Sequence, residues 1–455
     1  MPRVAVLAIV LALACGSTAA AEEPPAELPA APIEPATPKG EAPKPEEPKA
    51  DAPKPAPVAG WDDMFYLRSP DKRFSLRFTG QIQADYRDYF DSGDVTDIDQ
   101  FLIRRARFGL ESVLFQNYEF RFLTDFGQAQ TRLVDAFLNV KYWEEAQFTA
   151  GKFKQPFSYE QLAQDRFTPF MERSLIDQLV PARDVGVMLQ GQNLFSGMLD
   201  YALAGSNGEQ NGDGDTNGAK DITSRVAVRP FAWRKGGVLE RLQVGAAVDV
   251  GNQFEPMAPQ TLRTPANIPF FQFSRSAIAD GRRSRWSPEL IYFFGPFGFA
   301  TQYFHMDQYL RPSAIGPASA IQVNVPFEGY YIQATWLVTG EDRISYSNAI
   351  SPKRPFNPHR NTFGPGAWEV VARVSRMAVG DVVFAPGAAR LADPLAVSNT
   401  ATEMTLGFNW YLNKWVRMQL NYEHSWFGRP VRLGPGPGGL FRDHDSLQTR
   451  LQFIF

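Results

Sequence analysis

LQTRLQFIF, residues 447–455, ends the chain and alternates between apolar and polar side chains. Successive side chains of an extended strand point to opposite faces, so a period of two indicates a strand with two unlike faces. One face holds Leu447, Thr449, Leu451, Phe453 and Phe455. The other face holds Gln448, Arg450 and Gln452. The end of the chain therefore predicts a β-strand with an aromatic-rich apolar face and a charged polar face.

The same alternation runs through most of the chain before this strand. Phe74, Leu76 and Phe78, for example, are separated by Ser75 and Arg77. A β-sandwich would give a similar pattern, so the period alone predicts only an all-β fold. We expect sixteen strands, over residues 72–90, 100–116, 117–127, 132–143, 146–154, 184–193, 196–206, 221–231, 239–252, 283–294, 297–308, 328–339, 367–379, 402–412, 415–426 and 445–455.

The lengths of the strands and of their connections favour a membrane barrel over a soluble sandwich. Strands of about ten residues cross a bilayer when they are tilted. Very short joins, such as 116–117 and 413–414, alternate with long connections, such as 155–183 and 253–282. Short periplasmic turns and long external loops are typical of outer-membrane barrels, as is a final strand ending on Phe455. We therefore predict a 16-stranded antiparallel transmembrane β-barrel, with a secreted soluble β protein as the alternative.

The N-terminal part of the chain has a different character. Arg3 precedes an apolar run from Val4 to Ala14, and small residues follow, which is typical of a cleaved signal peptide over residues 1–21. Residues 22–60 are almost entirely Pro, Ala, Glu and Lys, and such a composition predicts a disordered, extended linker. The linker is either a passive tail or, through residues 22–59, a contact with the cell wall or with a periplasmic partner. The barrel is expected over residues 61–455.

Charge and cysteine content exclude several classes of protein. The chain has 46 basic and 49 acidic residues, so a nucleic-acid partner is not expected. Its single cysteine, Cys15, lies in the predicted signal peptide, which excludes a disulfide scaffold and a cysteine-based site in the mature chain. We expect no metal and no cofactor.

The polar face of the strands would line a wide, hydrated lumen. These charges either pair across the lumen or leave an excess of cations that attracts anions. The period of two puts inside the barrel Arg77, Arg87, Arg105, Arg107, Arg121, Arg225, Arg229, Arg283, Arg285, Arg373, Arg417 and Arg450, together with Glu111, Glu119, Asp125, Asp135, Glu289, Glu369 and Glu423.

Two features interrupt this simple pattern. The period points Arg104 away from Arg105 and Arg107, and a lipid-facing arginine at mid-bilayer costs about 2–4 kcal/mol. Arg104 is therefore expected near a membrane boundary or a subunit contact. The connection 155–183 carries Phe157 and several further apolar residues, which suits a packed loop, so we expect it to fold into the barrel and narrow it.

An enzyme is not expected, although His444, Asp445 and Ser446 are consecutive. Adjacent residues on a strand point to opposite faces, so these three side chains cannot assemble locally as a triad.

Several motifs resemble those of the phosphate-selective porin O and P family. They are Ile103-Arg104-Arg105-Ala106, Gly151-Lys152-Phe153-Lys154-Gln155-Pro156-Phe157, Met171-Glu172-Arg173, Gly329-Tyr330-Tyr331-Ile332-Gln333, Thr339-Gly340-Glu341-Asp342-Arg343, Gly366-Ala367-Trp368-Glu369 and Leu406-Gly407-Phe408-Asn409-Trp410-Tyr411-Leu412-Asn413. The resemblance implies a trimeric sixteen-stranded porin that passes phosphate or related anions through an arginine-lined pore. It also implies that Arg104 and Arg105 form a pair near the constriction, contrary to the strict period of two.

The chain departs from that family in the expected constriction loop. Gln161 stands where phosphate-selective members carry a lysine, and Gln164 and Asp165 replace small hydroxyl residues. A carboxylate there would repel phosphate, so phosphate selectivity does not transfer with the fold.

Taken together, the sequence predicts a homotrimeric porin, in contact with outer-membrane lipid, in the outer membrane of a Gram-negative cell. It would pass small hydrophilic solutes by diffusion, with a preference for anions such as phosphate or related oxyanions. The alternative is an envelope structural protein that tethers the outer membrane to the cell wall through residues 22–59.

Overall fold

The computed structural model describes residues 58–455 except 63, 91–98, 210–211, 213, 216, 257–258 and 435–438. The predicted signal peptide, and the linker up to residue 57, lie outside the described residues. The predicted boundaries of these segments therefore stay predictions. Within the described part of the chain, no helix has the length and apolar character needed to cross a membrane.

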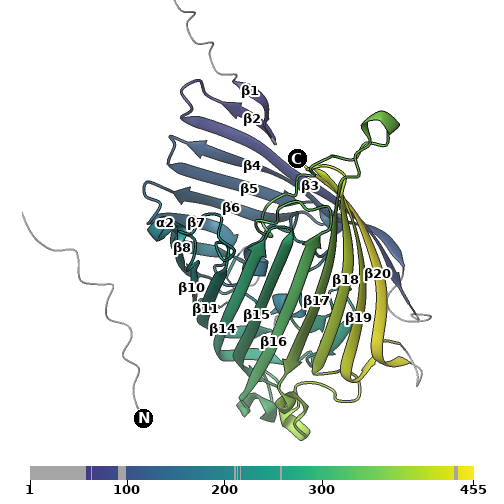
Figure 1. Cartoon of the computed structure of the whole chain (residues 1–455). Helices are drawn as coiled ribbons and strands as arrows, with labels where there is room; N and C mark the ends of the chain where they lie inside the picture. The colour runs from purple at the N-terminus through teal and green to yellow at the C-terminus, as the bar shows by residue number, and fades with distance from the viewer. Residues whose placement is uncertain are drawn as a thin grey trace, which may run out of the picture. The chain divides into compact units, whose positions relative to one another are not determined.

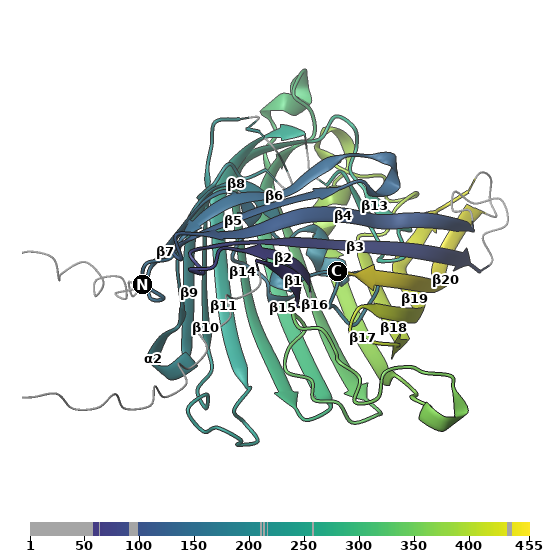
Figure 2. The same cartoon turned by 90° about the horizontal axis from the view of Figure 1, so that it is seen from above.

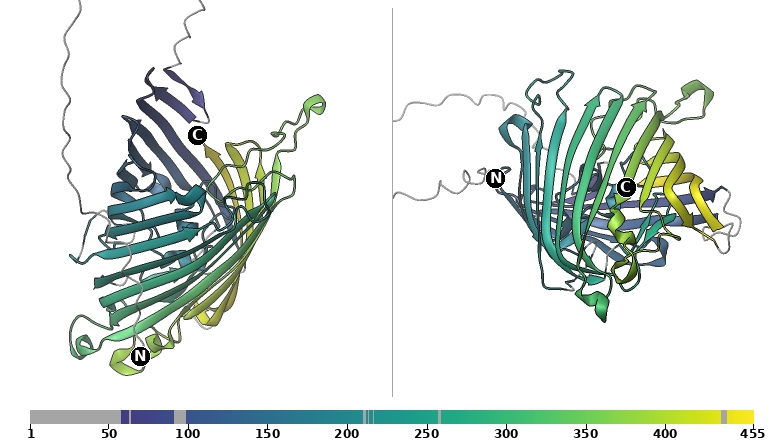
Figure 3. Two further views of the ribbon diagram at one scale, coloured as in Figure 1. Left: turned by 60° about the vertical axis from the view of Figure 1, so that its left-hand side comes forward. Right: turned by 90° about the horizontal axis from the view of Figure 1, so that it is seen from below.

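Sixteen antiparallel strands form a closed barrel, as the sequence predicts (Figure 1). Each strand pairs with its neighbour along the chain, and the last strand pairs with the first to close the ring. Figures 2 and 3 show the strands curving around a central space. The strands are β3 (Phe74–Tyr89), β4 (Gln100–Leu114), β5 (Tyr118–Asp125), β6 (Arg132–Val140), β7 (Gln147–Lys154), β8 (Arg183–Asn193), β9 (Leu199–Ser206), β10 (Asp221–Val228), β11 (Gln243–Pro256), β14 (Ile278–Phe294), β15 (Phe297–Arg311), β16 (Val323–Leu337), β17 (Ala367–Val379), β18 (Thr400–Tyr411), β19 (Val416–Arg432) and β20 (Leu440–Ile454).

The connections distinguish the two ends of the barrel. Short joins such as 115–117 and 295–296 lie at one end, here called the turn end, and most long connections lie at the other, the loop end. The connection 338–366 is the long exception at the turn end. In outer-membrane barrels the end with short turns faces the periplasm.

The C-terminal strand shows the alternation that the sequence predicts. Leu451 and Phe453 are 52% and 44% exposed on the outer wall, whereas Arg450 and Gln452 are buried towards the lumen. Phe455 then closes the barrel, because its backbone N–H and C=O both bond to Gly80 of β3. A side chain at position 80 would clash, since a Cβ there would lie 2.3 Å from the Phe455 ring. The terminal ring thus covers the gap that a glycine leaves in the first strand.

We expect removal of Phe455 to reduce assembly of the barrel severalfold. The truncation deletes two hydrogen bonds of the closing ladder and uncovers Gly80. The measurement is the amount of folded, heat-modifiable protein in the outer membrane at matched expression. Phe455→Leu, which keeps the backbone bonds, is the control and should assemble better than the truncation. Equal assembly of the truncated and full-length chains would contradict this account.

Two short hairpins are additions to the predicted strands. β1 (Ala59–Asp62) pairs with β2 (Met64–Arg68), which continues the sheet beside the start of β3. β12 (Thr261–Arg263) pairs with β13 (Pro269–Gln272) within the connection from β11 to β14. These strands have three to five residues, too few for a period of two to stand out.

The β12–β13 hairpin packs inside the loop end of the barrel. Phe270 and Phe271 are buried, and the C=O of Phe270 accepts a hydrogen bond from the N–H of Ser398 at 2.8 Å. The Phe270 ring stacks on that of Phe427 in β19 at 6.4 Å. This apolar packing occupies the lumen beside β18 and β19, so open space is left towards the opposite wall.

Candidate functional site

The connection 155–182 lies inside the barrel, which confirms the prediction that it packs in the lumen. It contains α1 (Tyr159–Leu162) and the 3-10 turn η2 (Leu175–Gln178). Ser158 begins α1 by accepting the Gln161 N–H at its Oγ, and the same hydroxyl donates to Gln302 of β15 at 2.8 Å. One small side chain therefore both starts the helix and attaches it to the wall.

Hydrogen bonds from several strands hold the loop backbone in place. The C=O of Pro169 accepts from Asn409 of β18 at 2.8 Å and from Gln419 of β19 at 3.2 Å. The C=O of Met171 accepts from Arg450 of β20 at 2.6 Å. The loop therefore spans the lumen instead of hanging from one edge.

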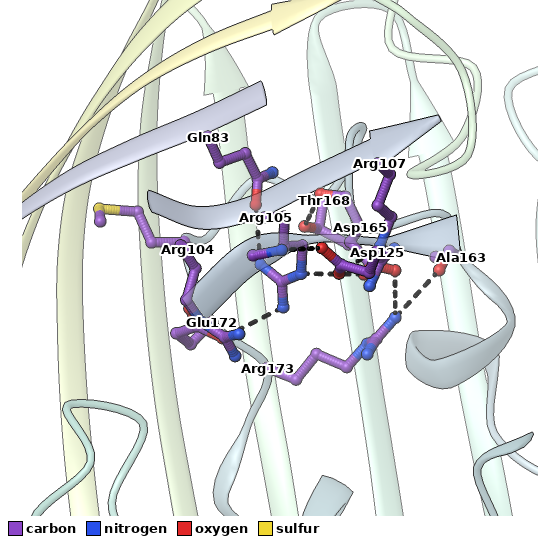
Figure 4. A network of polar contacts seen from close by, with 12 residues as sticks. Gln83, Arg104, Arg105, Arg107, Asp125, Ala163, Asp165, Thr168, Glu172 and Arg173 are labelled. Atoms are coloured by element: carbon purple, nitrogen blue, oxygen red, sulfur yellow. Dashed lines mark hydrogen bonds and ion pairs between the residues drawn. The ribbon is translucent and has the colours of Figure 1, made fainter. Parts of the chain in front are cut away.

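A β-bulge in β4 decides where Arg104 points. The pairing passes from Gln83↔Arg105 to Ala84↔Ile103, so Arg104 is an extra residue without a partner in the ladder. The bulge turns Arg104 to the same side as Arg105, and both guanidinium groups bind Glu172 (Figure 4). The period-based expectation of an outward Arg104 is therefore wrong, because the bulge breaks the period. The arginine pair implied by the family resemblance is present.

Glu172 is the charge centre of the loop. It accepts hydrogen bonds from Arg104 at 2.8 and 3.1 Å, Arg450 at 3.0 Å, Arg87 at 3.2 Å and Arg105 at 3.4 Å. Burial raises the pKa of Glu172, but the neighbouring arginines outweigh burial and hold that pKa well below its ordinary value. One carboxylate therefore joins the loop to β3, β4 and β20.

Asp165 forms a second, similar centre. Its carboxylate binds Arg107 at 2.7 Å, Arg173 at 3.0 Å and Arg105 at 3.2 Å (Figure 4). Burial raises the pKa of Asp165, but the arginines, Arg107 first, outweigh it and keep the pKa well below its ordinary value. Asp165 is therefore a neutralised anchor of the arginines, whereas the sequence suggested a free negative charge facing the solute.

The two predicted loop glutamines differ in position. Gln164 borders the open cavity described below, where its Oε1 accepts from Arg166 at 2.8 Å. Gln161 is only 3% exposed and does not border that cavity. The structure thus brings Gln164 and Asp165 to one surface and leaves Gln161 beneath it.

Most of the other predicted lumen arginines pair with carboxylates, as one of the two sequence-based readings proposed. Arg285 binds Asp249 at 2.7 Å, and Arg283 binds Asp221 at 2.6 Å. Arg77 lies opposite Glu111 in the β3–β4 register. The remaining pairs are Arg121 with Asp135, Arg225 with Glu289, Arg229 with Asp200 and Arg373 with Glu160 and Glu403.

The strand alternation also separates the three residues that suggested a hydrolase. His444 and Ser446 are buried towards the lumen. Asp445 points to the outer wall, where it binds His424 Nδ1 at 2.7 Å. No triad can form from these neighbours.

An open cavity of about 480 Å³ remains between the loop and the wall of β3 to β8. Six cationic side chains line it but only three acidic ones. The cations are Arg107, Arg121, Lys141, Lys154, Arg166 and Arg183, and the acids are Glu119, Asp135 and Asp165. Counted with each side chain in its ordinary ionised form, the formal net charge of this lining is therefore +3 (six minus three).

Four of these cations were not among the residues predicted from the sequence. Lys141 lies near the end of the predicted strand 132–143, where few repeats remain to fix the period of two. The sequence places Arg183 as the last residue of the connection 155–183, but it begins β8, and Arg166 lies in the loop. Lys154 donates to the C=O of Leu162 and of Ala163, so it also supports α1. In the sequence, the family motif that contains Lys152 and Lys154 was the only feature that could have indicated this part of the cavity lining.

A closed sixteen-stranded barrel with a charged lumen narrowed by an inward loop defines an outer-membrane porin. The sequence pattern of the family described as phosphate-selective porin O and P matches residues 76–455, and the chain belongs to this family. Its place is accordingly the outer membrane of a Gram-negative cell, where it forms a channel.

Known proteins support the same assignment. Porin O of Pseudomonas aeruginosa is 23% identical over 420 residues, which cover 85% of this chain and 89% of that protein. The solved structure of outer-membrane expressed OmpT of Vibrio cholerae superposes with a TM-score of 0.51 at 11% identity, covering 86% of this chain and 99% of that one. A loop-deletion mutant of the same protein gives a TM-score of 0.51 at 10% identity. These structures support the fold alone.

Proposed function

We propose that the protein is a passive channel, not an enzyme, through which small hydrophilic solutes diffuse with a moderate preference for anions. The observation that carries this proposal is the +3 net charge of the cavity lining between the loop and β3 to β8. A charged lining between low-dielectric walls raises the local concentration of ions of opposite sign.

The preference for anions is moderate because ion pairs with carboxylates neutralise most of the cationic side chains. Arg107 and Arg121, which border the cavity, each bind a carboxylate within 3.2 Å. Arg166 binds only uncharged groups among the described residues, Thr79 at 2.6 Å and Gln164 at 2.8 Å. Arg166 therefore presents its full charge to a passing solute.

Phosphate is one expected solute, but we propose that it is not strongly selected. The name of the family supports phosphate or a related oxyanion. Against strong selection, Asp165 binds Arg105, Arg107 and Arg173 within 3.2 Å and so offsets part of their charge, and the uncharged Gln164 borders the cavity. Phosphate should therefore permeate beside chloride without blocking the chloride current.

We also propose a homotrimer embedded in outer-membrane lipid. One solved OmpT structure that this chain resembles is described as a trimer form, with a TM-score of 0.50 and 10% identity. The apolar outer wall, with residues such as Leu406, Leu420 and Leu451 exposed, supports contact with lipid. Contact with the cell wall through residues 22–59 stays a prediction, which deletion of this segment would test. If the segment is a tether, the deletion should weaken the cell envelope. If the protein acts only as a porin, the deletion should leave the conductance unchanged.

The double change Arg121→Gln with Arg166→Gln tests the role of the lining charge. It lowers the net lining charge from +3 to +1 (two cations removed). One charge about 8 Å from an ion in water contributes about 0.5 kcal/mol, and screening at about 0.1 M salt leaves about half of this energy. The charge attracts the anion and repels the cation equally, so each charge changes the anion-to-cation permeability ratio about twofold. We therefore expect this ratio to fall about fourfold in the double variant. Reversal potentials in a potassium chloride gradient measure the ratio.

Lys235→Gln with Arg234→Gln is a matched control, because both residues lie in the connection between β10 and β11, outside the cavity lining. It should leave the ratio unchanged. An unaltered ratio in the Arg121 and Arg166 variant would refute the role proposed for this cavity.

A further inference from the structure

The outer part of the connection between β16 and β17 forms a projecting segment, residues 351–366, here called the finger. It leaves the turn end of the barrel and stands clear of the wall in each view (Figures 1 and 3). Asn357 and Gly364 pair across it, with N–H to C=O distances of 3.0 and 3.1 Å. At its base, the N–H of Phe356 donates to the C=O of Leu412 at 2.6 Å. The finger therefore has a defined backbone structure that hydrogen bonds hold in place.

The finger is rooted on aromatic residues of the outer wall. The C=O of Pro365 accepts from the indole N–H groups of Trp368 at 3.0 Å and of Trp410 at 2.8 Å. The Phe356 ring packs edge-on against Trp410 at 4.9 Å. Indole rings on the outer wall near the ends of barrel strands mark the membrane–water interface. The root of the finger therefore lies at the depth of the lipid headgroups on the periplasmic side.

The finger carries an excess of positive charge, and the one carboxylate among the described residues that is bonded to it, that of Glu341, accepts the backbone N–H of Lys353 at its base at 3.1 Å. Residues 345–366 contain no Asp or Glu. Lys353, Arg354, His359 and Arg360 are exposed, and no ion pair joins them to any described residue. Phe363, beside them in the chain, is 56% exposed. An apolar ring among exposed cations is complementary to a surface with anionic groups on its outside and apolar groups below them.

We propose that the finger binds the headgroups of anionic phospholipids in the periplasmic leaflet. Arg354 and Arg360 supply forked donors for phosphate oxygens, and Phe363 supplies an apolar group that enters the acyl boundary. Trp368 and Trp410 hold the base of the finger, and with it the cations, beside the bilayer. Lipid is therefore favoured as the ligand over a more distant polymer such as the cell wall.

Lipid retention by the purified full-length protein tests this proposal. The folded barrel in neutral detergent is mixed with equal amounts of phosphatidylglycerol and phosphatidylcholine, and bound lipids are counted by native mass spectrometry. The native protein should retain phosphatidylglycerol preferentially. Arg354→Gln with Arg360→Gln should reduce that preference by about fivefold for each arginine, since one basic side chain near an anionic surface is worth about 1 kcal/mol.

Arg275→Gln with Arg390→Gln is the matched control, because it makes the same charge change in loop-end connections. Heat-modifiable mobility confirms that each variant is folded, and Phe363→Ser provides a second variant without a charge change. Loss of preference in the finger variants alone supports the proposal. An unchanged preference in both finger variants would overturn it, as would an equal loss in the control. Charge-dependent retention on isolated cell-wall sacculi without any lipid preference would also overturn it.

Discussion

Glu172→Gln should loosen the loop from the barrel wall and increase single-channel conductance together with current noise. The carboxylate accepts from Arg87, Arg104, Arg105 and Arg450 within 3.4 Å, so its removal leaves four guanidinium groups without their shared counter-charge. Breaking a buried ion pair costs about 3–5 kcal/mol, and we expect the lower end because the side chain keeps 11% exposure. Single-channel recording measures the conductance, and the temperature of heat modification measures the stability.

Glu111→Gln is the matched control for this change. Glu111 lies on the same wall but binds one arginine, Arg121, at 3.4 Å, and its side chain is 30% exposed. Its loss should cost about 1 kcal/mol or less. Equal effects of the two variants would contradict the central position given to Glu172.

The same carboxylate predicts how the loop responds to acid. The pKa of Glu172 in the folded barrel lies well below the ordinary value of 4.5. Its contribution to stability is therefore complete above pH 4.5 and is lost as the pH falls through the lower folded value. The difference in open-channel current noise between the native protein and the Glu172→Gln variant should accordingly stay constant from neutral pH to about pH 4.5, because Glu172 remains ionised throughout this range.

Asp165→Asn should raise the anion-to-cation permeability ratio. The change removes one negative charge from the cavity lining, taking its net charge from +3 to +4, and releases Arg105, Arg107 and Arg173 from a shared partner. One charge about 8 Å away changes the ratio about twofold in water at about 0.1 M salt, after screening, and more where the loop excludes water. Asparagine keeps the shape and part of the hydrogen bonding, so the loop should stay in place.

The reason for this expectation differs from the one that the sequence suggested. Asp165 appears in the sequence as a free carboxylate that repels phosphate, whereas the structure shows a carboxylate bound by three arginines. Asp200→Asn, which breaks a pair with Arg229 outside the cavity lining, is the control and should leave the ratio unchanged. An unchanged or lower ratio in Asp165→Asn would show that the loop does not border the conducting path.

The barrel itself was predictable because the alternation of side chains is local. Leu451 and Phe453 point outwards and Arg450 and Gln452 inwards because any strand with this order must place them so. Long strands carry enough repeats for the period to be recognised. The β12–β13 hairpin, with Arg263 and Phe270 in short strands, carries too few repeats.

The site was predictable only in part, because its chemistry depends on contacts between distant residues. Arg104 turns inwards through a bulge, which a strict period of two cannot foresee, although the family resemblance implied its pairing with Arg105. Glu172 is separated from Arg450 by 278 residues, and nothing local in either stretch shows that they meet. Sequence reasoning therefore placed charges inside the barrel but could not tell which of them neutralise one another.

The reversal potential of the native channel in a planar bilayer is the decisive measurement of whether the cationic cavity lining faces the conducting path. With a potassium chloride gradient, we expect a reversal potential whose sign shows a moderate preference for chloride over potassium. Replacing chloride by phosphate should leave a measurable anion current, and micromolar phosphate should not block the chloride current. A reversal potential of the opposite sign, reporting cation preference, would contradict the assignment of the +3 cavity lining to the conducting path.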